Sequence, residues 1–149
     1  MALQIIAVTN SIGALQVSGV RILDLDEIPS SGVLRAPVLF PEPLGFITDF
    51  ELERNSFGGG GVALQTARYN LNYTFLFAPI GAGRTGLDVY DEMVTKAAAI
   101  LDAVIAINTF SGGVDIVPLS PLEFGPVPDP AGNQFLGCRF VFRVTEFVN

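Results

Sequence analysis

The sequence contains one motif with the spacing of a nucleotide-binding turn. Gly81, Gly83 and Gly86 match the pattern GxGxxG, and they lie between a predicted strand and a predicted helix. That is the context of a dinucleotide-binding turn, in which the backbone approaches a pyrophosphate at a helix N-terminus. Nucleotide binding by residues 81–86 is therefore one hypothesis for this chain.

Three observations favour a purely structural loop at residues 81–86. The preceding strand carries Asn70, Asn72 and Thr74 on one face, whereas a central parallel strand is apolar on both faces. The sequence predicts a single strand–helix–strand unit, and a doubly wound sheet needs several. Asp88 would also place a carboxylate in the first helical turn, close to the position of a pyrophosphate. We therefore interpret the glycines as a turn into the helix.

Several acidic residues occur in short groups that could hold Mg²⁺ or serve acid–base catalysis. The groups are Asp24 with Asp26 and Glu27, Asp49 with Glu51 and Glu53, and Asp91 with Glu92. The second group alternates along a predicted strand and fits its solvent-exposed face equally well. Its like charges could also pair with arginines of a neighbouring chain, for which Arg68, Arg139 and Arg143 are candidates.

The side chains that catalysis needs are scarce. The chain has no histidine, which removes the commonest general base and zinc ligand. Cys138 falls on the apolar side of a predicted strand, which is typical of a core cysteine without a nucleophilic role. Lys96, the one lysine, lies on the polar side of a predicted helix. We expect no catalytic residue, no metal site, no cofactor and no enzymatic activity.

Length and composition predict a single domain, residues 1–149, that other protein chains partly cover. Half of the 149 residues are hydrophobic and 15% are charged, against about 25% charged in typical domains. A chain with so few charged residues is expected to leave apolar side chains on its surface, and exposed apolar patches usually mark an interface. One cysteine excludes an intrachain disulfide.

The charge balance opposes a nucleic-acid reader. Eight Lys and Arg against fifteen Asp and Glu give a net charge of −7, with no basic cluster, and stable nucleic-acid binding needs several phosphate contacts. An acidic surface suits a passage through which DNA slides without sticking. The start of the chain lacks the positive region of a signal peptide, and no apolar run is long enough to span a bilayer. We expect synthesis in the cytoplasm.

The first half of the chain predicts strands around a glycine-rich turn. Residues 2–15 fit a short amphipathic helix, with a strand as the competing prediction. Residues 19–23 are extended, residues 24–34 form a polar connection, and residues 37–40 form a short strand between prolines. Residues 46–57 alternate as in a strand with one solvent-exposed face and one packed face, and the packed face holds Phe46, Thr48, Phe50 and Leu52. Four glycines at 58–61 separate this run from the strongest strand signal, residues 64–77, so we expect a long hairpin.

The second half predicts one long helix followed by strands. The helix covers about residues 87–107, with Thr85 and Asp88 in the pattern of a capping box. Its apolar stripe is Val89, Met93, Ala97, Ile100 and Val104, widened by Tyr90, Val94, Leu101 and Ile105. A strand at 114–124, a proline-rich loop at 125–133 and a strand at 135–148 follow. The prediction is an α+β fold, with a mainly antiparallel sheet of five or six strands and the long helix on one face. The uncovered face and edges are then the expected contact surfaces.

This order of elements resembles a known protein family. A long strand of alternating character (residues 67–77) leads through a Pro/Gly loop into one amphipathic helix, and an aromatic strand (residues 137–144) ends the chain. Over residues 36–149 the pattern is similar to the tail terminator, or minor tail U-like, proteins of long-tailed bacteriophages. The family usually opens with a clear helix, which is weak in this sequence.

The resemblance implies a structural virion protein without catalytic residues. Members form a ring, commonly a hexamer, that caps the finished tail tube, stops its polymerisation and joins the head connector, while DNA passes through the lumen without specific binding. The implied partners are further copies of the chain, the tail-tube protein and a connector or stopper protein, and the implied location is the head–tail junction of the virion. The alternatives are another neck or tail component, namely a connector, stopper or tail-tube protein, and a small nucleotide-binding domain using Gly81 to Gly86.

Overall fold

Two long antiparallel strands form the centre of the molecule. The computed structural model describes residues 3–55, 64–81, 86–109, 113–119 and 121–148. Strand β4 (Leu64–Pro79) pairs with β7 (Gln134–Val148) from Gln65 opposite Val148 to Pro79 opposite Phe135. Because successive side chains point to opposite faces, the alternation of apolar and polar residues in both strands gives the sheet one apolar and one largely polar face.

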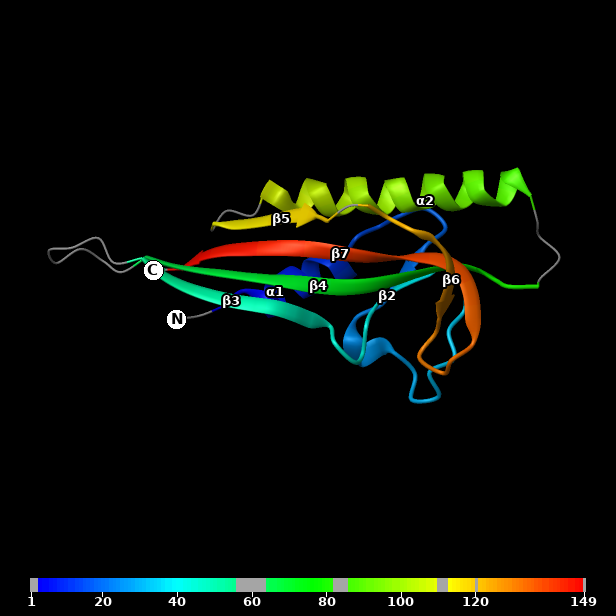
Figure 1. Cartoon of the computed structure of the whole chain (residues 1–149), viewed down its shortest axis with the longest axis horizontal. Coiled ribbons are helices and arrows are strands. Elements are labelled where there is room, and N and C mark those ends of the chain that lie inside the picture. Colours follow the sequence, from blue (N-terminus) through cyan, green and yellow to red (C-terminus); the bar gives the residue numbers. More distant parts are fainter. Residues whose placement is uncertain (1–2, 56–63, 82–85, 110–112, 120, 149) are drawn as a thin grey trace, which may run out of the picture.

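Shorter strands flank this central pair on both sides (Figure 1). On the outer side of β4 lie β3 (Ile47–Asn55) and β2 (Val38–Pro41), and β1 (Arg21–Ile22) runs parallel to β2. On the outer side of β7 lie β5 (Val114–Pro118) and β6 (Phe124–Pro128). The described residues thus form a seven-stranded, mostly antiparallel sheet, which confirms the α+β prediction and adds a strand or two to it.

Two helices cover the apolar face of the sheet. Helix α1 (Ile5–Gly13) confirms a short N-terminal helix over the competing strand, and α2 (Leu87–Ile105) continues into a 3₁₀ turn, η2 (Ala106–Thr109). Val8 and Ile12 of α1 join the predicted buried stripe of α2 in one core with the aromatic residues of β4 and β7. None of the described helices is long and apolar enough to cross a membrane.

A second, smaller core lies on the opposite face near the end of β4. The segment after β1, which includes a 3₁₀ turn η1 (Leu25–Glu27), crosses this part of the sheet. The cluster consists of Leu23, Leu34, Val38, Phe40, Leu76, Val127 and Phe135. The sheet is therefore sheltered on both faces at this end, where the sequence analysis expected cover on one face only.

The structure corrects the prediction for residues 114–133. The predicted strand 114–124 ends at Pro118, and a separate strand, β6, begins at Phe124, the last residue of that predicted strand, and extends into the predicted loop. Pro126 and Pro128 lack a backbone N–H, but among the described strands β6 pairs with β7 alone, so its outer side needs no donor. Prolines were a signal of an edge strand here rather than of a loop.

Two further predictions need correction. The N-cap of α2 is Gly86, with φ of 103° and no capping side chain, so the helix begins one residue later than the capping box implies, and Thr85 lies outside the described residues. In β3 the pairing shifts between Thr48 and Glu51, and Asp49 has φ of 51°. After this bulge Phe50 stacks on Tyr69 and Leu52 lies opposite Ala67, on the packed side as predicted, but both remain about half exposed. The predicted hairpin of β3 and β4 is confirmed by their antiparallel pairing, whereas the glycines 58–61 lie outside the described residues.

Candidate interaction surface

The carboxylates of β3 pair with arginines of the same chain. Glu53 accepts a bond from Arg68 at 3.1 Å, and Glu51 accepts one from Arg143 at 3.3 Å. The Asp49 carboxylate accepts a bond from the Asn70 amide at 2.9 Å. These contacts neutralise the open half of the sheet face opposite the helices. Arg68 and Arg143, two of the three arginines predicted as partners for these carboxylates, therefore contact them within the same chain.

The other carboxylate groups do not form a metal site. Among the described residues no group of three or more Asp, Glu, Cys or His side chains is arranged to hold an ion. Burial, with the negative charges of Glu27 and Asp26, raises the pKa of the Asp24 carboxyl. Its Oδ1 atom is buried and has no hydrogen-bond partner in the part of the chain that the structure describes. Asp91 and Glu92 lie on the exposed side of α2.

The glycine motif does not lie in a dinucleotide-binding unit. Both Gly81 and Gly86 have positive φ, at 88° and 103°, as expected for a turn that only glycine adopts without strain. Residues 82–85 lie outside the described residues. The neighbours of β4 on both sides, β2, β3 and β7, are all antiparallel to it, whereas a dinucleotide-binding turn follows a central parallel strand.

The remaining reactive side chains serve the structure. Cys138 is fully buried in the main core, and burial raises the pKa of its thiol to about 12. Lys96 donates to the Ser18 carbonyl at 3.3 Å and so ties α2 to the segment after α1.

One buried polar group in the main core, the Glu146 carboxylate, was not predicted from the sequence. Glu146 is 1% exposed, and its carboxylate accepts bonds from the Tyr69 hydroxyl and from the Gln4 N–H, both at 2.6 Å. Gln4 is the N-cap of α1 and has no side-chain capping bond, so Glu146 supplies the negative charge that a helix N-terminus favours. Its role is to fix α1 to the sheet. The sequence does contain a signal for this group, because Glu146 continues the alternating positions of the apolar face of β7.

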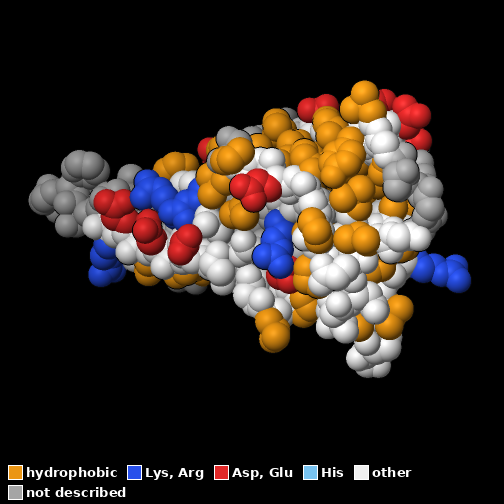
Figure 2. Space-filling view, turned by 45° about the vertical axis from the view of Figure 1, so that its right-hand side comes forward, with side chains coloured by type: hydrophobic (Ala, Val, Ile, Leu, Met, Phe, Trp, Pro, Cys, Tyr) orange, Lys and Arg blue, Asp and Glu red, His pale blue; other side chains and the backbone are white. Residues whose placement is uncertain are grey.

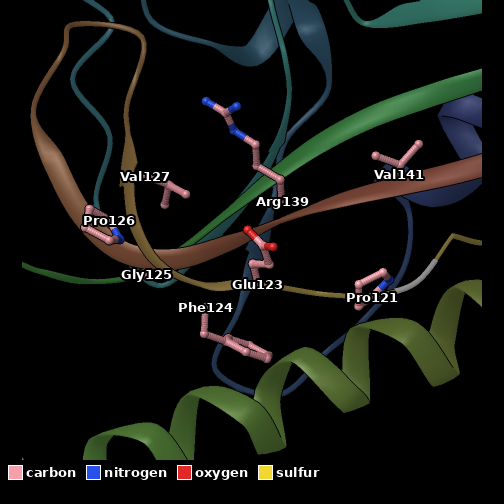
Figure 3. A pocket seen from close by; sticks show the side chains of 8 residues that line it. All are labelled: Pro121, Glu123, Phe124, Gly125, Pro126, Val127, Arg139 and Val141. Carbon is pink, nitrogen blue, oxygen red and sulfur yellow. The ribbon is translucent and has the colours of Figure 1, made fainter.

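A groove of about 550 Å³ lies where β5 gives way to β6 along β7 (Figure 3). Gly125 and Gly137 face each other there without side chains. Phe124 points towards α2, while Arg139 leaves β7 in the opposite direction. Neither Arg139 nor Glu123 forms an ion pair with another described residue. The groove combines one cation and one anion with apolar side chains.

The most distinctive exposed surface is a second apolar stripe on α2. Leu87 is 84% exposed, Tyr90 and Val94 are each 45% exposed, and Ile105 is 44% exposed. Tyr90, Val94 and Ile105 each follow a buried residue by one position, which is about 100° around the helix. The predicted wide apolar arc of α2 is therefore real, but the sheet covers only one side of it.

This stripe is hollowed on both sides of Tyr90. One hollow, of about 410 Å³, is lined by Leu87, Tyr90 and Val94 together with Asp88 and Asp91. The other, of about 330 Å³, lies between Tyr90, Ile80, Pro126 and Leu136. Figure 2 shows hydrophobic side chains gathered along the upper part of the molecule, where α2 runs, with acidic side chains at the border. We call the region of Ile80, Leu87, Asp88, Tyr90, Asp91 and Val94 the α2 surface.

The α2 surface has the properties of a protein-binding site. A half-exposed tyrosine between two hollows is a common anchor in interfaces, and clustered exposed apolar residues usually mark a contact with another molecule. Asp88 and Asp91 make its border negative, and Lys96 is directed to the other side of the helix.

No protein-family model matches the chain, and no curated protein matches it.

Proposed function

We propose that this protein is a structural subunit that assembles with copies of itself into a ring at the head–tail junction of a long-tailed bacteriophage, as a tail terminator. The observation that carries the proposal is the α2 surface, an apolar, acidic-bordered helix face on an otherwise well-packed domain. Leaving such side chains in water is unfavourable, at about 25 cal/mol for each Å² of apolar surface, so association that covers them is favourable.

In this role the protein acts by shape. The ring caps the tail tube, stops the addition of tube protein and presents its other side to the head connector or stopper protein. The net charge of −7 suits a lumen through which genomic DNA passes without binding, because an acidic wall repels phosphates. The protein would be made in the host cytoplasm and reside in the virion.

Light scattering coupled to size-exclusion chromatography, with negative-stain electron microscopy, tests the proposal. The wild-type chain should form one closed ring of defined mass, and the variant Tyr90→Ser/Val94→Ser should be a folded monomer. Ile6→Ser is a matched control, since Ile6 is 76% exposed on α1, outside the α2 surface. A wild-type chain that stays monomeric, even with tube protein present, would refute the proposal.

The alternative within the same class is another neck or tail component. A tail-tube protein stacks into long polymers, whereas a terminator stops at one ring. Sedimentation of the pure protein separates the two, since a ring gives one boundary and a polymer a broad, concentration-dependent one.

A further inference from the structure

The charge of the α2 surface limits what can bind there. Asp88 and Asp91 line the hollow beside Tyr90, and Asp102 is exposed further along the same helix. Two α2 surfaces packed on each other would bring like charges together, which strongly disfavours an interface. The favoured occupant has an apolar side chain next to a cation.

The chain itself carries a segment of that kind. In the loop between η1 and β2, Val33 is 56% exposed and Arg35 is exposed, while Leu34 between them is 4% exposed and anchored in the second core. Arg35 forms no ion pair with another described residue. The loop thus presents an apolar side chain and an exposed cation two residues apart.

This loop is held in shape before any partner binds. The Gly32 N–H donates to the Pro29 carbonyl at 2.9 Å, and the Gly32 carbonyl accepts from the Ala131 N–H at 3.2 Å. Gly32 has φ of 73°, and a Cβ there would lie 2.8 Å from the Ala131 nitrogen. A loop fixed by such contacts loses little conformational entropy when it binds, which favours affinity.

We propose that the Val33–Arg35 loop of one copy docks on the α2 surface of the next, with Val33 in the hollow beside Tyr90 and Arg35 against Asp91. The inference rests on the proposed self-assembly and specifies its contact. The loop projects from the lower side of the molecule and α2 runs along the upper side (Figure 1). Two different surfaces on opposite sides make a head-to-tail contact, which closes into a ring where the rotation between subunits allows it.

Charge reversal tests the contact. Asp91→Lys and Arg35→Glu should each weaken self-association at least about tenfold, because each places like charges in the interface. Mixing the two variants should restore assembly, because the lysine introduced on α2 of one variant then meets the glutamate introduced in the loop of the other. The control variants Asp102→Lys and Arg54→Glu reverse exposed charges on α2 and β3 outside the contact, and they should assemble like the wild type. Sedimentation velocity gives the mass distribution, and circular dichroism verifies that each variant folds.

The outcomes separate this inference from the proposed function. If the wild type forms rings and either single reversal leaves assembly unchanged, or the mixture fails to recover, the loop does not dock on α2 and the ring proposal stands. If the wild type does not associate at all, both proposals fail.

Discussion

Replacement of Gly137 by alanine should destabilise the domain more than any other single added methyl group at a described glycine. Gly137 lies in β7 between Leu76 of β4 and Gly125 of β6, next to the irregular pairing at the end of β4. A Cβ at this position would overlap the Phe75 carbonyl oxygen, and it would lie 3.0 Å from the Phe75 carbonyl carbon and 2.9 Å from Cγ2 of Val127. The overlap is with backbone, so no side-chain rotation relieves it.

The magnitude follows from how far the sheet has to open. To reach a normal van der Waals distance, the alanine methyl group and the Phe75 oxygen must move apart by more than about 1 Å from their overlapping positions. Because β4 and β7 are the paired centre of the sheet, the shift strains their ladder on both sides. Overpacking of this kind costs about 3 kcal/mol, at the upper end of the usual range. In a domain of this size that corresponds to a fall in Tm of roughly 6–12 °C.

Gly125→Ala is the matched control. Gly125 is opposite Gly137 in the same strand pair, and a Cβ there would meet nothing within 4 Å. Its φ is not positive, so alanine should be neutral or stabilise by up to about 1 kcal/mol through the unfolded state. Urea unfolding followed by circular dichroism gives the free energy of unfolding for both variants. A Gly137→Ala variant within about 1 kcal/mol of the wild type would show that the strand junction relaxes, contrary to this reasoning.

Other predictions concern buried titratable groups. Burial and then the hydrogen bond and charge of Glu146 raise the pKa of Tyr69, so its contribution to stability is complete below the ordinary tyrosine pKa of about 10 and declines at higher pH. Tyr69→Phe should lower the free energy of unfolding at pH 7 by about 1–2 kcal/mol, because it leaves a buried Glu146 oxygen without a donor, and urea titrations from pH 7 to 11 should show a weaker alkaline decline in the variant. The pKa of Asp24 is also raised, so at neutral pH its charged carboxylate destabilises the fold. The favourable contribution of Asp24 to stability is complete only below the ordinary aspartate pKa of 3.8, and it is lost as the pH rises through the folded-state pKa. Asp24→Asn should therefore stabilise the protein at pH 7 and make no difference well below pH 3.8, and equal stability of the two proteins at pH 7 would contradict this. The Cys138 thiol, fully buried and with a pKa of about 12, should react with a thiol reagent at pH 8 only as fast as the domain unfolds, and rapid labelling of the native protein would contradict its burial.

The sequence predicts the core of this fold well because strong periodicity reflects burial. The alternation in residues 64–77 and 135–148 corresponds to β4 and β7. All five residues of the predicted apolar stripe on α2 are buried. Each pattern extends over many residues, so local irregularities do not obscure it.

Local geometry is what the sequence left unresolved. The bulge in β3 includes a single residue, Asp49, in a left-handed conformation that the alternation of the strand does not reveal. Strand β6 was not predicted because Pro126 and Pro128 lower strand propensity, although a strand at the edge of a sheet tolerates them. The partners of Glu51 and Glu53 could not be assigned because strand register, which alternation alone does not fix, decides which arginine lies opposite.

The candidate site was half predicted. The widened apolar arc of α2 was visible from the positions of Tyr90, Val94 and Ile105, but sequence alone could not say which side of the arc the sheet would cover. Buried and exposed stripes differ by a single residue step, about 100° around the helix. Only the placement of α2 over β5 and β7 shows that these residues remain in water.

The edges of the sheet favour association through α2 over association by strand pairing. The outer edge of β3 carries a bulge and the charged residues Glu51, Glu53 and Arg54, features that prevent edge-to-edge addition. On the other side, Pro118 ends β5, and prolines interrupt β6. Such edges disfavour a ladder that continues from one copy to the next. In the proposed contact a helix surface meets a shaped loop and sets one angle between neighbouring copies, and a head-to-tail contact of this kind closes into a ring where that rotation allows it.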